Sequence, residues 1–385
     1  MAQIAVMERR CTGCGLCVKN CPFGGIELKS GRAELTAGCR VCGICVKNCP
    51  EKAILKLETT AKSVDKSKWR DILVFAEVSG GHVHPVALEL AGKAQELCKS
   101  VPGYKVRAVM VGSGVEACAQ ELLHYGVSEV AVYDDPELAY FRADVYAACV
   151  EDAIRTMRPA VVLVGATSLG RSLAPRLATR FHTGLTADCT KLELRESSDL
   201  VQIRPAFGGN IMAQIVTTHT RPQFATVRYK VMDTPVRSEQ ESGKIVVRAI
   251  PKGVAASKAS CVSVQPVPPK ASISDAEVLV VGGRGLQRES DMDMIRELAA
   301  LLHGDWAVTR PLVEKGWATN ERQIGLSGRT VRPRLIITCG VSGAIQFTSC
   351  MNGSEHIVSI NNDPDAPIFG TAHIAIVDDL YRVVP

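Results

Sequence analysis

Residues 11–22 read CTGCGLCVKNCP and residues 39–50 read CRVCGICVKNCP, so one cysteine spacing occurs twice. This spacing, C-x2-C-x2-C-x3-C followed by proline, is typical of bacterial ferredoxins that bind two [4Fe–4S] clusters. A cubane cluster needs four thiolates at tetrahedral corners, and in this pattern the fourth cysteine of each run ligates the cluster of the other run. The predicted ligands of the first cluster are Cys11, Cys14, Cys17 and Cys49, and those of the second are Cys39, Cys42, Cys45 and Cys21.

Zinc and disulfide bonds are two other uses of clustered cysteines. Zinc ribbons bind their metal with pairs of cysteines rather than with trios followed by Cys-Pro. Disulfides persist in oxidising compartments, and residues 1–10 contain no long apolar stretch of the kind found in a secretory signal. We therefore expect a cytoplasmic protein whose residues 1–58 form a small α+β ferredoxin-like domain. The clusters would contribute much of the folding free energy of so small a domain.

The composition is that of a globular protein. The chain has 385 residues, of which 46% are hydrophobic and 22% charged, and this length suggests two or three domains. The net charge of +5 is small and aromatic residues make up 5%, so a nucleic-acid-binding surface is not expected. No apolar run approaches the roughly 18 residues of a membrane-spanning helix.

Residues 59–68 are predicted to form a flexible linker, because they are polar and include a single apolar side chain beyond alanine. Residues 69–250 then alternate apolar strands with amphipathic helices, as in the strands at 72–76 and 106–111 and the helix at 88–97. This alternation predicts a parallel sheet covered on both faces. Towards the end of this region, residues 190–250 become β-rich.

A second linker is predicted over residues 251–270, where four prolines lie among Ala, Ser, Lys and Val. Residues 271–385 follow as a third domain, with strands at 278–281, 335–337, 356–360 and 374–377 and a helix at 292–302. The predicted fold class is therefore α/β, with two doubly wound, Rossmann-like domains preceded by the small ferredoxin-like domain.

Two glycine-rich turns follow strands of the third domain. They read Gly282-Gly283-Arg284-Gly285 and Gly340-Val341-Ser342-Gly343. Neither matches the G-x-G-x-x-G fingerprint, but the backbone N–H groups of such a turn and the dipole of the following helix can bind a pyrophosphate. Two such turns in one sheet favour a nucleotide-binding site.

Several longer stretches resemble the α subunit of electron-transfer flavoproteins. They are residues 204–210 (RPAFGGN), 282–286 (GGRGL), 327–329 (SGR), 339–346 (CGVSGAIQ) and 361–369 (NNDPDAPIF). The resemblance covers residues 70–385. With its N-terminal cysteine runs, the chain is similar to the ferredoxin-fused α subunits that anaerobes use in flavin-based electron-bifurcating acyl-CoA reductase or lactate dehydrogenase complexes.

The resemblance implies one FAD in the third domain and no catalytic residue of the chain's own. By position, Arg284 would approach the pyrophosphate, Arg310 would lie over the flavin ring and Ser327 would hydrogen-bond flavin N5. Asn361 and Asp379 would reach the adenosine half. The full set implied by the resemblance is Arg284, Thr309, Arg310, Ile324, Gly325, Leu326, Ser327, Ser342, Gly343, Ala344, Ile345, Gln346, Phe347, Asn361, Asp379 and Leu380.

Two of these positions depart from the common pattern of the family. Leu326 stands where many members have a glutamine before the N5-bonding hydroxyl. Phe347 stands where many have a histidine that faces the flavin C2 oxygen and favours the anionic, one-electron-reduced flavin. Because phenylalanine cannot donate a hydrogen bond, we interpret the changes as tuning of the flavin potential rather than loss of FAD.

The resemblance also implies partners. In the family, the region matching residues 69–250 packs on a β subunit, which in bifurcating members carries a second FAD and oxidises NADH. This chain would then relay electrons through its own FAD to an acyl-CoA or 2-hydroxyacid dehydrogenase, and its clusters would exchange low-potential electrons with ferredoxin. The alternatives are a non-bifurcating electron-transfer flavoprotein that links ferredoxin, a dehydrogenase and a quinone pathway, and a non-catalytic redox sensor or assembly module.

Overall fold

The structure is a computed structural model that describes residues 2–36, 38–58, 64–206, 211–251, 257, 259–265 and 272–385. The chain divides into two compact units, Met1–Val64 and Asp65–Pro385, which are described separately. Within the described residues, no helix is long and apolar enough to cross a membrane. Residues 207–210 of the family motif and most of the predicted linker at 251–270 lie outside the described residues.

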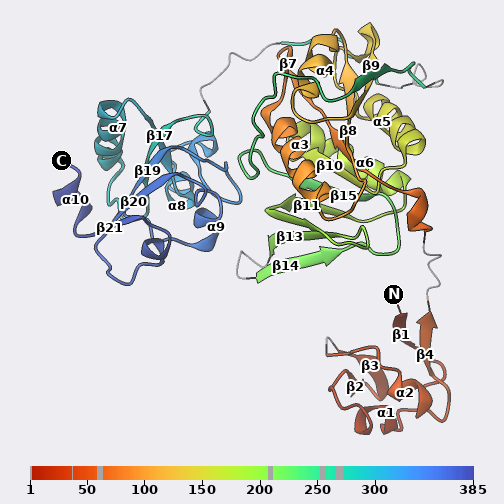
Figure 1. Cartoon of the computed structure of the whole chain (residues 1–385). Helices are drawn as coiled ribbons and strands as arrows, with labels where there is room; N and C mark the ends of the chain where they lie inside the picture. Colours follow the sequence, from red (N-terminus) through yellow and green to blue (C-terminus); the bar gives the residue numbers. More distant parts are fainter. Residues whose placement is uncertain are drawn as a thin grey trace. The chain divides into compact units, whose positions relative to one another are not determined.

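Two antiparallel strand pairs and two short helices form the first unit (Figure 1). Its elements are β1 (Ala2–Val6), α1 (Leu16–Lys19), β2 (Ile26–Lys29), β3 (Arg32–Leu35), α2 (Ile44–Lys47) and β4 (Ile54–Glu58). β2 and β3 form an antiparallel hairpin, and β4 pairs with β1. Each helix follows a glycine in the left-handed region, Gly15 with φ 73° and Gly43 with φ 81°, so each cysteine run turns sharply at a residue without a Cβ.

A seven-stranded parallel sheet forms the centre of residues 69–250, in the order β11-β15-β10-β5-β8-β9-β16. Its strands are β5 (Ile72–Phe75), β8 (Val106–Gly112), β9 (Glu129–Asp134), β10 (Val161–Gly165), β11 (Leu185–Cys189), β15 (Gln223–Val227) and β16 (Lys244–Val247). The chain enters the sheet at its centre with β5, adds β8 and β9 on one side and then crosses to add β10 on the other, as in doubly wound folds.

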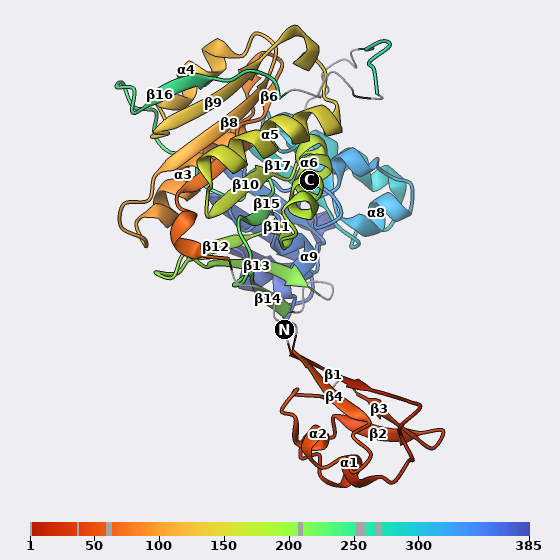
Figure 2. The same cartoon turned by 90° about the vertical axis from the view of Figure 1, so that its right-hand side faces the viewer.

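Helices cover both faces of this sheet. They are α3 (Pro85–Cys98), α4 (Glu116–Leu123), α5 (Ala143–Met157) and α6 (Ser168–Arg180). Ile72 and Val74 of β5 pack in one core with α3 and α4, whereas Leu73 and Phe75 pack in another with α5 and α6. Figure 2 shows α5 lying across the sheet. Burial on both faces explains why the strands read as continuous apolar runs.

A separate antiparallel sheet accounts for part of the β-rich stretch. Its strands are β12 (Lys191–Leu194), β13 (Leu200–Ala206) and β14 (Ile211–Val216). Just before β13, the Asp199 carboxylate accepts hydrogen bonds from Lys66 Nζ at 2.7 and 2.8 Å and from buried Arg221 at 2.8 Å. Lys66 begins a short 3-10 helix, Lys66–Lys68. The last residues of the predicted linker are therefore anchored in the second unit.

Residues 272–385 form a five-stranded parallel sheet in the order β18-β17-β19-β20-β21. Its elements are β17 (Val278–Gly282), α7 (Met292–Leu301), β18 (Asp305–Val308), α8 (Arg310–Glu314), β19 (Leu335–Cys339), α9 (Ile345–Thr348), β20 (His356–Asn361), β21 (Ile374–Val377) and α10 (Leu380–Val383). The chain passes from β17 to β18 on one side and returns to β19 on the other, so the topological switch point lies between β17 and β19. The two parallel sheets and the small first unit confirm the predicted fold class.

Candidate functional site

The two glycine-rich turns contact each other at the carboxyl ends of β17 and β19. Gly283 N–H donates to Cys339 O at 2.9 Å, and Gly285 N–H donates to Gly340 O at 2.9 Å. A Cβ on Gly283 would lie 2.3 Å from Gly340 O, far inside van der Waals contact, so this packing requires glycine. The paired turns lie at the switch point, where doubly wound folds bind their ligands.

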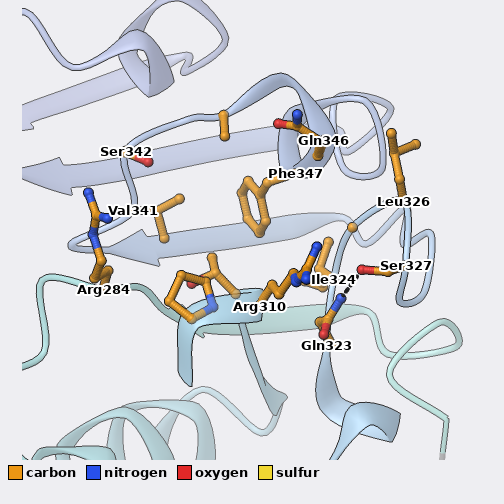
Figure 3. A pocket seen from close by; sticks show the side chains of 14 residues that line it. Arg284, Arg310, Gln323, Ile324, Leu326, Ser327, Val341, Ser342, Gln346 and Phe347 are labelled. Carbon is orange, nitrogen blue, oxygen red and sulfur yellow. Dashed lines mark hydrogen bonds between the residues drawn. The ribbon is translucent and has the colours of Figure 1, made fainter. Parts of the chain in front are cut away.

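A cavity of about 600 Å³ opens beside these turns, a volume typical of small-molecule sites. Its walls come from both turns, the start of α8, the loop at residues 323–327 and α9. Figure 3 shows Arg284 at one end of the cavity and Ser327 at the other, with Phe347 between them. Arg284, predicted for the pyrophosphate, and Ser327, predicted for the flavin ring, therefore lie at opposite ends of this cavity.

The Ser327 end presents an oriented hydroxyl group. Gln323 Nε2 donates to Ser327 Oγ at 2.8 Å, the bond drawn dashed in Figure 3, and Gln323 is 3% exposed. Because the serine oxygen accepts this bond, its own O–H proton is left to donate to an atom in the cavity. The sequence analysis identified Ser327 but missed Gln323, whose type and spacing do not separate it from an ordinary loop glutamine.

Thr309 and Arg310 bring polar groups to the cavity from the start of α8. Thr309 is 8% exposed, and its Oγ1 has no hydrogen-bond partner within the described residues. A buried hydroxyl without a partner is destabilising, so a polar group of a bound ligand would satisfy it. Arg310 Nε donates to Glu314 at 2.8 Å on the exposed side of α8, and the arginine remains a lining residue of the cavity.

One wall of the cavity is apolar. Phe347 projects from α9, is 5% exposed and packs in one core with Ile324 and Val341. A flat apolar wall of this kind suits an aromatic ring system. The ring also means that residue 347 presents no hydrogen-bond donor to the cavity.

A second cavity of about 300 Å³ shares Arg284 and Ser342 with the first. Asn361 and Asp379, predicted for the adenosine half, both line it. Asn361 Nδ2 donates to Val341 O at 2.8 Å, and the Asp379 carboxylate accepts the N–H of Tyr381 at 3.0 Å at the start of α10, so both side chains also shape the wall.

Nearly all predicted FAD residues line one of these two cavities, the exceptions being Gly343 and Ile345. The two cavities share a cationic side chain and the backbone of two glycine turns, which suits a diphosphate. The larger cavity adds an apolar wall, an oriented hydroxyl and the partnerless Thr309 oxygen. The residues therefore fit a dinucleotide with an aromatic ring system at one end.

The first predicted set of cluster ligands surrounds a single cavity. Cys11, Cys14, Cys17 and Cys49 all line it, although Cys49 lies in the other cysteine run. Backbone N–H groups donate to two of the thiols, Ala33 to Cys11 Sγ at 3.4 Å and Ala53 to Cys49 Sγ at 3.3 Å. Across the described residues, no three ligating side chains converge on one point as a single metal ion requires.

Thiols of the second predicted set also influence one another and accept backbone hydrogen bonds. Burial raises the pKa of the Cys45 thiol, and neighbouring Cys39 and Cys42 raise it further, against the opposing effect of backbone N–H groups. Gly25 N–H donates to Cys21 Sγ at 3.2 Å. Thiolates this close together need positive charge to remain ionised, and iron would supply it. All eight cysteines are free thiols in the structure.

Known protein families match three segments of the chain. Residues 10–54 match the 4Fe-4S dicluster domain, residues 72–252 the electron transfer flavoprotein domain, and residues 272–352 the electron transfer flavoprotein FAD-binding domain. A relative in Acetobacterium woodii, "Lactate dehydrogenase (NAD(+),ferredoxin) subunit LctC", is 48% identical over 365 residues, which is 95% of this chain and 87% of LctC. The chain belongs to the electron transfer flavoprotein α-subunit family.

Two further relatives in the family each match 82% of this chain. The electron transfer flavoprotein subunit alpha of Thermoanaerobacterium thermosaccharolyticum is 40% identical over 82% of this chain and 96% of its own length. Protein FixB of Azorhizobium caulinodans is 39% identical over 82% of this chain and 87% of its own length. The matched FAD-binding domain contains the larger cavity, and the dicluster match spans every predicted cluster ligand. These matches confirm the resemblance that the sequence analysis identified.

Proposed function

We propose that this chain is the electron-relaying α subunit of an electron-bifurcating flavoprotein complex, with one FAD in residues 271–385 and two [4Fe–4S] clusters in residues 1–58. The observation that carries the proposal is one chain that combines a flavin-sized cavity with two complete cysteine quartets. The similarity to LctC, whose name joins lactate dehydrogenase, NAD(+) and ferredoxin, supports it further.

FAD supplies one- and two-electron chemistry, and the chain's residues bind and tune it. In the proposed site, Arg284 and those turn N–H groups that do not already donate to backbone carbonyls would bind the pyrophosphate, and Arg310 would place positive charge beside the ring. Ser327, oriented by Gln323, would donate a hydrogen bond to flavin N5. Phe347 would pack against the ring and exclude water from that side.

The charge around the cysteines supports an acidic electron partner such as ferredoxin. Among the described residues, six exposed cations lie within three residues of a predicted cluster ligand, against two exposed acids, Glu8 and Glu51. The cations are Arg9, Arg10, Lys19, Arg40, Lys47 and Lys52. Cys14 and Cys42 are exposed, so each cluster would approach the surface. Because electrostatic attraction steers association, cations beside an exposed cluster favour docking of a negatively charged carrier there.

The proposed complex contains a β subunit with a second FAD that oxidises NADH, and a dehydrogenase partner. The name of LctC favours a 2-hydroxyacid dehydrogenase over an acyl-CoA dehydrogenase in this role. The chain would pass one stream of electrons through its FAD to the dehydrogenase and another through its clusters to ferredoxin.

The test is NADH-dependent reduction of ferredoxin by the purified complex, with and without the acceptor substrate of the dehydrogenase. Bifurcation requires that ferredoxin is reduced only when the acceptor is present. Ferredoxin reduction that is independent of the acceptor, or absent with it, would instead support the non-bifurcating alternative. Cys49→Ser should abolish ferredoxin reduction while FAD remains bound, and Cys261→Ser, at an exposed cysteine outside both quartets, should match the parent.

A further inference from the structure

Arg228 lies outside residues 271–385 but bonds to the loop at the ring end of the cavity. It follows directly after β15 in the second unit, and its NH2 donates to the carbonyl oxygen of Leu326 at 2.6 Å. Leu326 precedes Ser327, the residue that offers its hydroxyl to the cavity. We propose that Arg228 is a positioning residue that fixes the Leu326–Ser327 peptide and so aims the Ser327 hydroxyl; this inference rests on the proposed FAD site.

The backbone of Leu326 is bonded on both sides. Its N–H donates to Gln346 O at 3.0 Å, and its carbonyl accepts from Arg228. The Leu326 carbonyl and the Ser327 N–Cα bond lie in one rigid peptide plane. A group that fixes this carbonyl therefore fixes the direction from which the Ser327 side chain leaves the backbone.

Arg228 is itself oriented by an irregularity in β11. Asp188 Oδ2 accepts from Arg228 NH2 at 2.9 Å, and both carboxylate oxygens accept from Arg171 at 3.1 Å. The pairing of β11 with β15 shifts register at Asp188, whose φ is 56° and whose N–H donates to Thr226 Oγ1 at 3.0 Å. Bulges of this kind re-aim side chains near functional sites.

The charges of this network are retained inside the protein. Burial acts to raise the pKa of Asp188, but the two arginines outweigh it and hold the pKa below its ordinary value. The Arg228 side chain is 17% exposed, and its NH1 has no hydrogen-bond partner within the described residues. A mostly buried charge is weakly screened, so Arg228 also contributes positive potential near the ring end.

Arg171 provides a matched control. It binds the same carboxylate as Arg228, is 52% exposed, and makes no hydrogen bond to the Leu326 loop within the described residues. Loss of Arg171 therefore weakens the support of Asp188 without removing the bond to the Leu326 carbonyl. A merely structural role of the network predicts similar effects at both arginines, whereas positioning of Ser327 predicts an effect at Arg228 alone.

The experiment measures FAD affinity and the flavin midpoint potential in the full-length chain with Arg228→Met, Arg228→Lys and Arg171→Met. Arg228→Met should weaken FAD binding about tenfold, as expected for one charge-assisted hydrogen bond, and should lower the midpoint potential. Arg228→Lys keeps the charge and one donor, so it should shift both quantities in the same direction by less. Arg171→Met should match the parent.

The same measurements in a Ser327→Ala background test whether Arg228 acts through Ser327. In that background Arg228→Met should change the midpoint potential much less than in the parent, because coupled residues are not additive. An undiminished shift there, or parental values for Arg228→Met, would overturn the proposal. If Arg228→Met does not fold, parental values for Arg228→Lys overturn it instead. If the parental chain does not bind FAD, the proposed function is overturned as well. If the parental chain binds FAD and the Arg228 variants have the same FAD affinity and midpoint potential, only the positioning role is overturned.

Discussion

Gly283→Ala should damage the FAD site by separating the two glycine turns. The added Cβ would lie 2.3 Å from Gly340 O and 2.7 Å from both Gly340 C and Val341 Cα. Ordinary heavy-atom contacts lie near 3.5 Å, so the turns must separate by about 1 Å. All three atoms belong to the backbone, and no side-chain rotation can relieve the contact. Overpacking of this size lowers the free energy of unfolding by about 1–3 kcal/mol.

The same displacement should weaken FAD binding at least tenfold, because the backbone donors of the two turns lose their common geometry. The assay is FAD titration of the full-length chain by fluorescence quenching, together with chemical denaturation. Gly370→Ala is the control, since a Cβ there would meet nothing within 4 Å and no positive φ is involved. If Gly283→Ala binds FAD as tightly as Gly370→Ala, the paired turns are not the pyrophosphate site.

Four further outcomes are expected. Arg310→Ala should lower the flavin midpoint potential, because a positive charge beside the ring stabilises the reduced, anionic flavin; parental potential and FAD content would contradict its placement. Phe347→His should increase the yield of one-electron-reduced flavin in a stepwise reductive titration, and an unchanged yield would show that residue 347 does not face the ring. Anaerobically purified protein should contain about eight iron and eight sulfide per chain, and a value near four would contradict two clusters. Burial raises the pKa of Glu89 from 4.5 to about 7, so between these pH values the folded chain retains a proton that the unfolded chain has lost. The free energy of unfolding should therefore fall as pH rises from 4.5 to 7. Glu89→Gln should flatten this pH dependence.

The parts of the fold that the sequence predicted are those decided locally. A strand was predicted at residues 72–76 from an unbroken apolar run, and β5 (Ile72–Phe75) lies there, buried at every position. The two glycine turns were found in the same way, since each directly follows such a run. β11 and β18 were not predicted. β11 (Leu185–Cys189) contains the polar residues Thr186 and Asp188, which interrupt an apolar run. β18 (Asp305–Val308) is only four residues long. Neither segment therefore shows a hydrophobic pattern that identifies a strand.

The residues of the candidate FAD site likewise fall into those that the sequence predicted and those that it did not. Arg284 and Ser342 were predictable because their turns belong to strand–turn motifs, and their place in the sheet follows from the motif. Gln323 and Arg228 act through single hydrogen bonds to residues that the chain brings near them only on folding. The partner of Arg228 is a backbone carbonyl almost 100 residues away in the sequence. Every residue has such a carbonyl, so the amino-acid type at position 326 does not indicate the bond. No periodicity or motif could therefore assign it.

The distribution of polar groups along the proposed flavin site determines how a reduced ring would be stabilised. A histidine at position 347 would offer a hydrogen bond to the flavin, and Phe347 removes that donor from the middle of the cavity. The polar groups that remain lie towards the ends, with Arg284 at one end and Ser327, supported by Gln323 and Arg228, at the other. Negative charge on a reduced ring would then be stabilised mainly by the guanidinium groups and by one oriented hydroxyl. Because Arg228 is mostly buried and Arg310 is exposed on α8, salt should screen the effect of Arg310 more strongly than that of Arg228. The flavin potential would therefore depend on ionic strength chiefly through Arg310, and the share that survives high salt would come from the ordered loop that Arg228 holds.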